Sequence, residues 1–315
     1  MPKQAILLLA HGTPETVEQI PEYLANVTGG RSLPPAVVAE IERRYRLIGH
    51  SPLTEITLDF AGLLEKLMGA EGQTVPVYVG MRNWHPFIAE TIGQMRADGI
   101  EEAAVLCLAP QNSRTSTGLY RHAVEAAAEA EMPHLRIDFT PSWAQHPLLI
   151  TAFAERLRPA WTSLSAEVGE PVAVLFTAHS VPCRTIQATT DQAADTYAED
   201  AKRTAALVAE RVPEIAQWYF AFQSQGASGG PWIGPTAEQT LESLAAAGIK
   251  TILLQPVGFL CDHVEILYDV DIQFREFAAK LGIRLERTES LNLSETLVRA
   301  VAELTQLGLE RLRLL

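Results

Sequence analysis

Residues 172–182 read VAVLFTAHSVP, and a related stretch, AILLLAHGTP, occupies residues 5–14. Both are short apolar runs that end in Ala-His, with a proline three residues after the histidine. A continuous apolar run of this length, bounded by turn residues, is typical of a strand that is buried on both faces. The repeat therefore indicates two copies of one unit, each opening with such a strand.

Further apolar runs rich in Val, Ile and Leu alternate with longer amphipathic segments. We expect strands at residues 5–10, 75–79, 103–108, 135–139, 172–178, 218–222, 251–255 and 284–287. We expect helices at residues 35–48, 56–68, 89–98, 120–130, 193–211 and 237–247. This alternation predicts an α/β protein of two similar Rossmann-like lobes, each a four-stranded parallel sheet flanked by helices, with a cleft between the lobes.

The division between the lobes is placed near the middle of the chain. We predict an N-terminal α/β lobe over residues 1–150 and a C-terminal lobe over residues 151–315, which carries the candidate catalytic residues. Residues 159–171, which begin and end with proline, are the most linker-like stretch. The last helix is expected to pack back on the first lobe. In such folds ligands bind outside the carboxyl ends of the strands.

Composition excludes several classes of function. The net charge is −13, which argues against a nucleic-acid partner because phosphates call for Lys and Arg. No apolar stretch approaches the ~18–20 residues that cross a bilayer, and the apolar run at the N-terminus is too short for a signal peptide. Cys107, Cys183 and Cys261 form no CxxC pair, so we expect no cluster and a reducing cytoplasm.

His179 is the first candidate for chemistry, because it follows a buried strand at the edge where α/β proteins bind ligands. A histidine in such a place is more often a hydrogen-bonded structural residue. A titration near neutral pH would nevertheless let it act as a general base.

An acidic segment follows another strand of the same half. Asp262, Glu265 and Asp269 are spaced i, i+3 and i+7, which places them on one face of an α-helix, and Asp271 follows closely. A solvated helix face is the plain alternative. Carboxylate oxygens suit a divalent cation, and an imidazole beside them suits ferrous iron. Gly258 would let the backbone approach a flat ligand closely.

The glycine-rich stretch at residues 223–235, which contains Trp232, is expected to be an ordered loop at the site, with a plain surface loop as the alternative. The remaining histidines show no metal-ligand spacing and receive no role, although His263 lies next to the acidic face.

Taken together, these motifs resemble those of the ferrochelatase family. The matching pieces are TAHSVP at 177–182, FQSQG at 222–226, WIGP at 232–235, PVGFLCDHVE at 256–265, GHSPL at 49–53, YVGMR at 78–82 and LAP at 108–110. The resemblance runs from the first strand to beyond Asp271 and so covers nearly the whole chain, and the combination of motifs is highly specific. The resemblance implies a lyase that inserts ferrous iron into a porphyrin in haem biosynthesis, with porphyrin and iron as its partners.

The resemblance also implies roles for individual residues. The family's histidine falls on His179 and its glutamate on Glu265, as the pair that accepts protons and handles the metal. The acidic row that continues from the glutamate falls on Asp269 and Asp271, as further metal residues. Many relatives have another acid where this chain has Gln273.

Two segments that some family members have are not found in this sequence, and this indicates the branch of the family. The chain has no long C-terminal extension with cluster-binding cysteines, and no apolar lip between Leu33 and Gly49. The resemblance thus implies a short, cytoplasmic monomer without an iron–sulfur cluster or a permanently bound cofactor, with Fe2+ as substrate. Coproporphyrin III is favoured as the porphyrin, and protoporphyrin IX stays open.

In that branch, porphyrin contacts fall on Arg31, Arg44, Ser51 and Tyr120. His11 stands where relatives carry the tyrosine of an A-Y-G-T-P motif, so its imidazole is expected either to contact iron and porphyrin or only to hydrogen-bond to the loop. Two other functions stay open: a cobalt chelatase for sirohydrochlorin-type tetrapyrroles, and a non-catalytic bilobal protein that binds haem or a metal.

Overall fold

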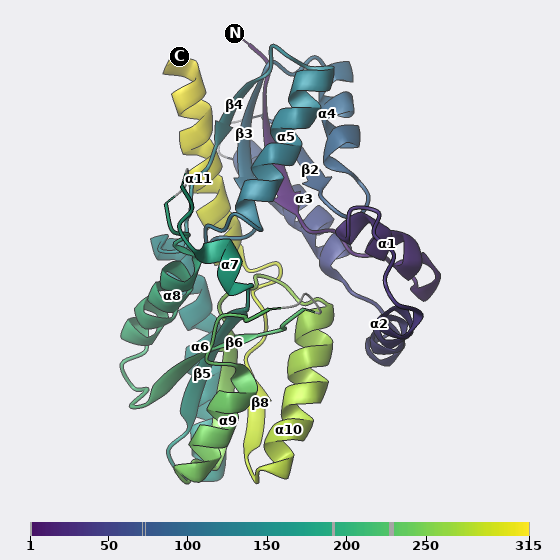
Figure 1. Ribbon diagram of the computed structural model, residues 1–315. Helices are drawn as coiled ribbons and strands as arrows, with labels where there is room; N and C mark the ends of the chain where they lie inside the picture. The colour runs from purple at the N-terminus through teal and green to yellow at the C-terminus, as the bar shows by residue number, and fades with distance from the viewer. Residues whose placement is uncertain (1, 71, 73, 191–192, 227–229, 315) are drawn as a thin grey trace. The chain divides into compact units, whose positions relative to one another are not determined.

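The structure is a computed structural model of the chain and describes residues 2–70, 72, 74–190, 193–226 and 230–314. The described residues form two compact units, each built on a four-stranded parallel sheet (Figure 1). No helix within these ranges combines the length and the apolar character that a membrane span requires. Each unit is described in turn.

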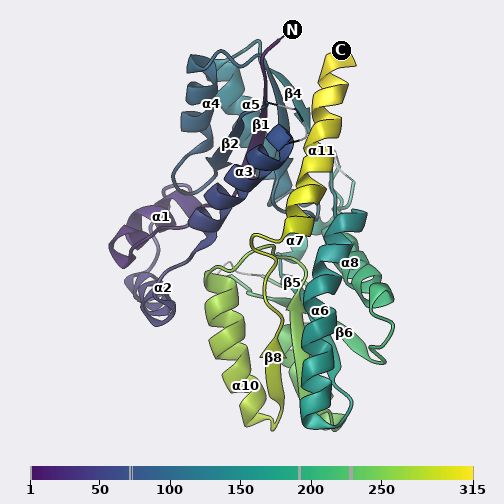
Figure 2. The same cartoon turned by 180° about the vertical axis from the view of Figure 1, so that it is seen from behind.

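The sheet of the first unit has the order β2-β1-β3-β4. Its strands are β1 (Gln4–Ala10), β2 (Val77–Met81), β3 (Glu102–Cys107) and β4 (Arg136–Phe139). Its helices are η1 (Val17–Gln19), α1 (Ile20–Val27), α2 (Pro35–Ile48), α3 (Leu53–Ala70), α4 (Ile88–Ala97), α5 (Thr117–Glu131) and α11 (Glu295–Leu314). Helices α4 and α5 cover one face of the sheet, and α3 and α11 cover the other (Figures 1 and 2). The last helix thus packs on the first sheet.

The second unit repeats this strand order as β6-β5-β7-β8. Its strands are β5 (Ala173–His179), β6 (Trp218–Gln223), β7 (Thr251–Pro256) and β8 (Arg284–Arg287). Its helices are α6 (Pro147–Val168), α7 (Cys183–Ile186), α8 (Tyr197–Arg211), α9 (Ala237–Ala246), the π-helix η2 (Glu265–Phe274) and α10 (Arg275–Lys280). Because β1 and β5 hold the same place in their sheets, the predicted duplication of a four-stranded α/β unit is confirmed.

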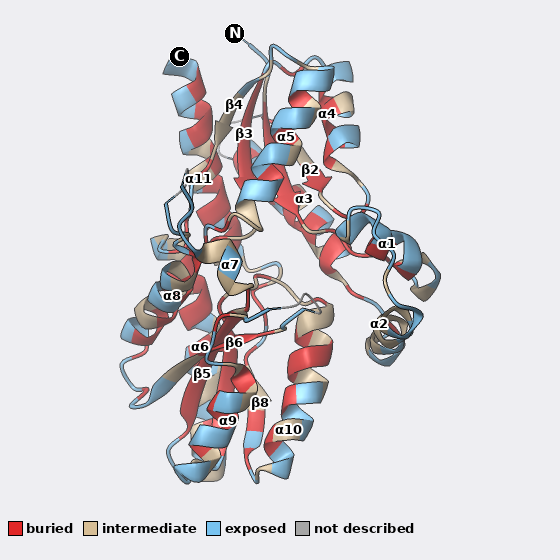
Figure 3. Cartoon of the chain, viewed as in Figure 1, coloured by how far each residue is buried: buried red, intermediate tan, exposed pale blue. Residues whose placement is uncertain are grey.

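Burial follows the pattern that the sequence predicted. Strands β1, β3, β5 and β7 are buried almost throughout, and the helices that pack on the sheets bury mainly the side that faces the sheet (Figure 3). Two further interactions fix α11 to its own sheet. Gln4 Nε2 donates to the Leu309 carbonyl at 3.2 Å, and Arg311 forms a two-pronged ion pair with Asp138.

The predicted boundary between the lobes needs correction. The units divide at residues 142 and 143, the short segment 110–115 belongs to the second unit, and residues from 292 onward belong to the first. The proposed linker at residues 159–171 lies largely in α6, which continues through Pro159. An interior proline costs about 3 kcal/mol, but burying a large apolar side chain contributes about 1.5–3 kcal/mol. Helix α6 buries several large apolar side chains: Leu149, Ile150, Phe153, Leu157 and Leu164.

Candidate active site

His179 is the last residue of β5. Its ring Nδ1 hydrogen-bonds to the Ser180 carbonyl, and the Tyr197 hydroxyl donates to the His179 carbonyl at 2.7 Å. A carbonyl can only accept, so Nδ1 carries the proton in the neutral ring and Nε2 is left as the acceptor. The side chain keeps 31% of its surface exposed, so Nε2 is accessible to a ligand.

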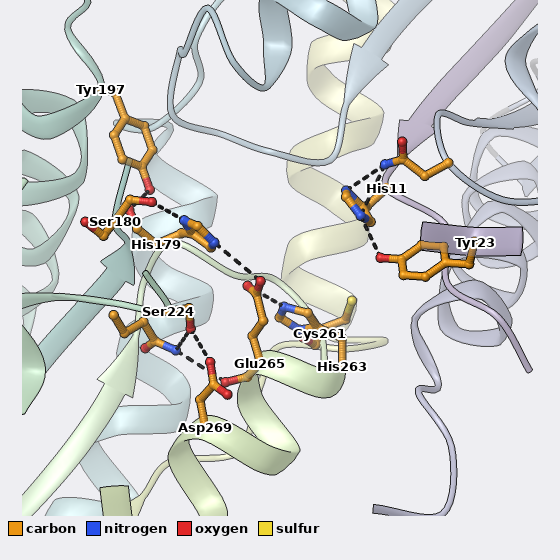
Figure 4. A network of polar contacts seen from close by, with 12 residues as sticks. His11, Tyr23, His179, Ser180, Tyr197, Ser224, Cys261, His263, Glu265 and Asp269 are labelled. Carbon is orange, nitrogen blue, oxygen red and sulfur yellow. Dashed lines mark hydrogen bonds and ion pairs between the residues drawn. The ribbon is translucent and has the colours of Figure 1, made fainter. Parts of the chain in front are cut away.

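Glu265, the first residue of η2, lies opposite that acceptor (Figure 4). The distance from His179 Nε2 to Glu265 Oε1 is 3.3 Å. Burial lowers the pKa of His179, but the charge and hydrogen bond of Glu265, the Ser180 carbonyl and the charge of Asp269 together outweigh it, and the net effect raises the pKa. Burial raises the pKa of Glu265, but the charge and hydrogen bonds of His179 and His263 hold this pKa well below 4.5.

His263 completes a row of three side chains that the sequence did not predict. Its Nε2 lies 3.5 Å from Glu265 Oε2, and its Nδ1 hydrogen-bonds to the Cys261 carbonyl at 3.0 Å. The ring is buried and packs against Phe259, with centroids 4.6 Å apart. The Glu265 carboxylate therefore has an imidazole on each oxygen. The D-H-x-E spacing was the available signal, because it places His263 two residues before Glu265.

Asp269 lies one turn after Glu265 in the π-helix η2, on the side of the helix that faces the end of β6 (Figure 4). Its side chain is buried, and Oδ2 accepts a hydrogen bond from Ser224 Oγ at 2.5 Å. Gln223 Nε2, from the end of β6, donates to the Glu265 carbonyl at 3.3 Å. The carboxyl ends of β5 and β6 and the start of η2 thus supply one polar cluster (Figure 4).

The predicted helix face of Asp262, Glu265 and Asp269 is wrong at Asp262, and Asp271, which follows closely, has a partner elsewhere. Asp262 precedes the helix, and its Oδ1 accepts from Ser290 Oγ at 2.7 Å. Both oxygens of Asp271 bind the Arg287 guanidinium, each at 2.8 Å. Arg287 also lies 3.3 Å from Asp262 and is 13% exposed. These two carboxylates therefore neutralise a largely buried arginine, and Asp271 is not placed with the metal-handling candidates.

Gly258 has a different role from the one expected. A Cβ at this position would lie 2.7 Å from Ala178 Cβ and 3.3 Å from the His179 nitrogen. Glycine is therefore required for close packing of the β7–η2 segment against the end of β5. It thereby supports the backbone of His179, while its approach to a flat ligand stays a prediction.

The glycine-rich loop lies beside His179, as expected of a loop at the site. Ile233 donates its backbone N–H to the Val181 carbonyl at 3.0 Å, and the Trp232 ring centroid is 6.5 Å from that of His179. Residues 227–229 of this loop lie outside the described residues.

In the first unit, His11 follows β1 and has two hydrogen-bond partners of that unit. His11 Nε2 is 2.9 Å from the Tyr23 hydroxyl, and Asn83 Nδ2 is 3.1 Å from His11 Nδ1 (Figure 4). Both ring nitrogens therefore have partners, and an iron contact would require one of them to move. The roles of His11 in metal and porphyrin binding stay predictions.

The other predicted porphyrin contacts have distinct surroundings within the first unit. Arg31 is exposed and donates to the Thr28 carbonyl, while Arg44 pairs with Glu40 at 3.0 Å. Ser51 is buried, and its carbonyl accepts from Thr13 Oγ1 at 3.5 Å, which ties it to the loop after β1. Tyr120 is buried in the core with Arg82 over its ring. Their contacts with porphyrin also stay predictions.

Among the described residues, no group of three or more His, Cys, Asp and Glu side chains is arranged to hold a metal ion. Cys107, Cys183 and Cys261 are free thiols. The two imidazoles and two carboxylates described for the second unit lie close together without the geometry of a closed metal cage.

Two units with the same strand order, each with a histidine at the end of its first strand, define a chelatase-like α/β protein. A solved structure with this architecture is the sirohydrochlorin chelatase SirB from Bacillus subtilis in complex with cobalt. It aligns with a TM-score of 0.56 at 12% identity and covers 98% of this chain and 96% of its own. At that identity the likeness shows the fold alone.

Sequence comparison resolves the family. The ferrochelatase family model matches residues 3–308. The ferrochelatase of Acidobacterium capsulatum is 56% identical over 99% of this chain and 96% of its own length. The coproporphyrin III ferrochelatase of Mycolicibacterium vanbaalenii is 34% identical over 96% of this chain and 89% of its own length. The chain belongs to the ferrochelatase family, and its activity is that of a lyase that inserts ferrous iron into a porphyrin in haem biosynthesis.

Proposed function

We propose that the row His179, Glu265 and His263 carries the proton chemistry of iron insertion, with Asp269 as an oxygen ligand for the arriving metal. The observation that carries this proposal is the 3.3 Å approach of Glu265 to the one ring nitrogen of His179 that can accept a proton. A base and a neighbouring carboxylate are what the removal of pyrrole protons requires.

The reaction exchanges two pyrrole N–H protons for one Fe2+ ion. His179 Nε2 accepts a proton from a pyrrole nitrogen, and the resulting imidazolium is stabilised by the Glu265 carboxylate beside it. Release of that proton by way of Glu265 restores the base for the second one. His263 holds the other oxygen of Glu265 and so fixes the direction in which the carboxylate points. A porphyrin held bent would expose its nitrogen lone pairs to the metal.

The metal is a substrate in this scheme, and we propose that no permanently bound cofactor is needed. Protons are accepted by side chains of the protein itself, and oxygen ligands of the Asp269 type suit a divalent cation in transit. Metal-free protein should therefore become fully active when Fe2+ and porphyrin alone are supplied. A requirement for another metal or an organic cofactor would contradict this point.

We propose coproporphyrin III as the porphyrin substrate. It carries four propionates, whereas protoporphyrin IX carries two, so it demands more cationic and hydrogen-bonding partners. The cations expected to meet these propionates are Arg31, which is exposed, and Arg44, which Glu40 would have to release. A relative named for coproporphyrin III at 34% identity supports this choice.

The test is iron insertion into each porphyrin under anaerobic, reducing conditions. The proposal predicts that kcat/KM for coproporphyrin III exceeds that for protoporphyrin IX by about 10-fold or more, because a site built to pair buried propionates discriminates against a ligand that lacks them. A higher kcat/KM for protoporphyrin IX would reverse the assignment of the substrate and leave the proton chemistry unaffected.

A further inference from the structure

Ser224 has an unusual backbone for a serine. Its φ is 60°, and among the non-glycine residues that the structure describes only Asn292 shares a positive φ. Asparagine visits this left-handed region readily, whereas a serine there is strained by its Cβ. Strained backbone of this kind clusters at functional sites and persists where surrounding contacts hold it.

The contacts that hold Ser224 lead to the candidate site. Its Oγ donates to Asp269 Oδ2 at 2.5 Å, and Gln223 Nε2 lies 3.3 Å from the same Oγ and donates to the Glu265 carbonyl at 3.3 Å (Figure 4). A hydroxyl that accepts from an amide becomes a better donor to a carboxylate. Ser224 thus ends a short chain of hydrogen bonds that runs from β6 to η2.

The partner of this bond is a buried carboxylate. Asp269 is 6% exposed, and a carboxylate at that depth requires donors of fixed direction. A glycine at position 224 would adopt the same backbone without strain. The hydroxyl is therefore what serine adds at this position.

We propose that Ser224 is a positioning residue for metal handling: its strained backbone aims the hydroxyl at Asp269 and fixes that carboxylate for the incoming iron. The inference rests on the proposed function, in which Asp269 is an oxygen ligand of the metal in transit. Ser224 touches neither iron nor porphyrin in this role. Its effect should appear in the dependence of the rate on iron and not in porphyrin binding.

The experiment compares Ser224→Gly, Asp269→Asn and the double variant in the full-length enzyme, with iron and porphyrin varied separately. Ser224→Gly relieves backbone strain but removes a donor from the buried Asp269 carboxylate, so the Tm should change little. The KM for Fe2+ should rise about 10-fold, as the loss of an outer hydrogen-bond partner does at metal sites. The KM for porphyrin should not change. The double variant should be no worse than Asp269→Asn alone, because both remove the same effect.

Two further variants sharpen the comparison. Asn292 is the other described non-glycine residue with a positive φ, and it lies outside the site. Asn292→Gly should therefore leave the KM for Fe2+ unchanged. Ser224→Asn keeps a donor on a side chain that tolerates this backbone and should recover part of the iron affinity.

The outcomes separate the two proposals. If Asp269→Asn raises the KM for Fe2+ and Ser224→Gly does not, the positioning role is overturned and the role of Asp269 stands. If neither variant changes it, both roles fail. A fall in Tm together with equal losses for iron and porphyrin would mark Ser224 as a structural residue and would also overturn the inference.

Discussion

His179 Nε2 and Glu265 Oε1 lie 3.3 Å apart, at the carboxyl end of β5 and the first residue of η2. The Ser180 carbonyl orients the ring from the opposite nitrogen, so the acceptor atom faces the carboxylate. This arrangement joins a base to the group that balances its charge. It also makes the titration of each residue depend on the other.

The first prediction concerns Glu265→Gln. Burial lowers the pKa of His179 and the Glu265 charge raises it, so removing that charge should make the pKa fall. Iron insertion should slow by about 100-fold, the usual size of a lost acid–base contribution. The pKa can be followed through the ring proton signals of His179 in an NMR titration. A pKa equal to that of the parent enzyme would show that the two side chains are not coupled.

The same pair predicts how stability depends on pH. The pKa of His179 is raised in the folded state, so its contribution is complete below 6.5 and is lost as the pH rises through the folded value. The pKa of Glu265 is lowered, so its contribution is present above 4.5 and is lost as the pH falls. Urea unfolding should therefore show the largest deficit of Glu265→Gln between 4.5 and 6.5. A deficit that is the same at pH 9 would contradict this linkage.

A third prediction concerns Gly258→Ala. The added methyl would meet Ala178 Cβ at 2.7 Å and the His179 backbone nitrogen at 3.3 Å, so the end of β5 that carries His179 must shift. Overpacking of this kind costs about 1–3 kcal/mol in the free energy of unfolding, and activity should fall with it. Gly93→Ala in α4 is the matched control, because its Cβ meets nothing within 4 Å. That control should be neutral or stabilising by about 0.5–1 kcal/mol.

Arg287→Met is expected to destabilise the fold. The guanidinium is 13% exposed and binds both Asp271 and Asp262, so its loss leaves two partly buried carboxylates without a counter-charge. We expect a loss of about 2–4 kcal/mol in urea unfolding. Arg299→Met removes an exposed i,i+4 pair with Glu295 and should cost less than about 0.5 kcal/mol. Equal effects of the two variants would contradict the account of Arg287.

The elements that the sequence predicts best are those whose cause lies in their own residues. The strands were found because β1, β3, β5 and β7 are continuous apolar runs. Helix α6 was missed because Pro159 reads as a break, although the buried face of the helix outweighs its cost. The composition of η2 does not indicate a π-helix. The sequence was therefore interpreted with an α-helical period, which placed Asp262 on the same helix face as Glu265.

The candidate site was predictable to the extent that its residues lie close in sequence or match a family motif. Asp271 could not be separated from Asp269 because its partner, Arg287, comes from β8 and is identified only by the fold. The bond from Ser224 to Asp269 spans 45 residues and depends on a backbone angle that no residue pattern encodes. His263 was visible beside Glu265, but only the structure shows which oxygen it holds.

The central claim is that His179 is the proton acceptor, and His179→Ala tests it most directly. Coproporphyrin III binding should be retained, measured by the change in porphyrin absorbance on titration, while anaerobic iron insertion falls by at least about 100-fold. Turnover within a few-fold of the parent enzyme, with porphyrin bound equally well, would contradict the account.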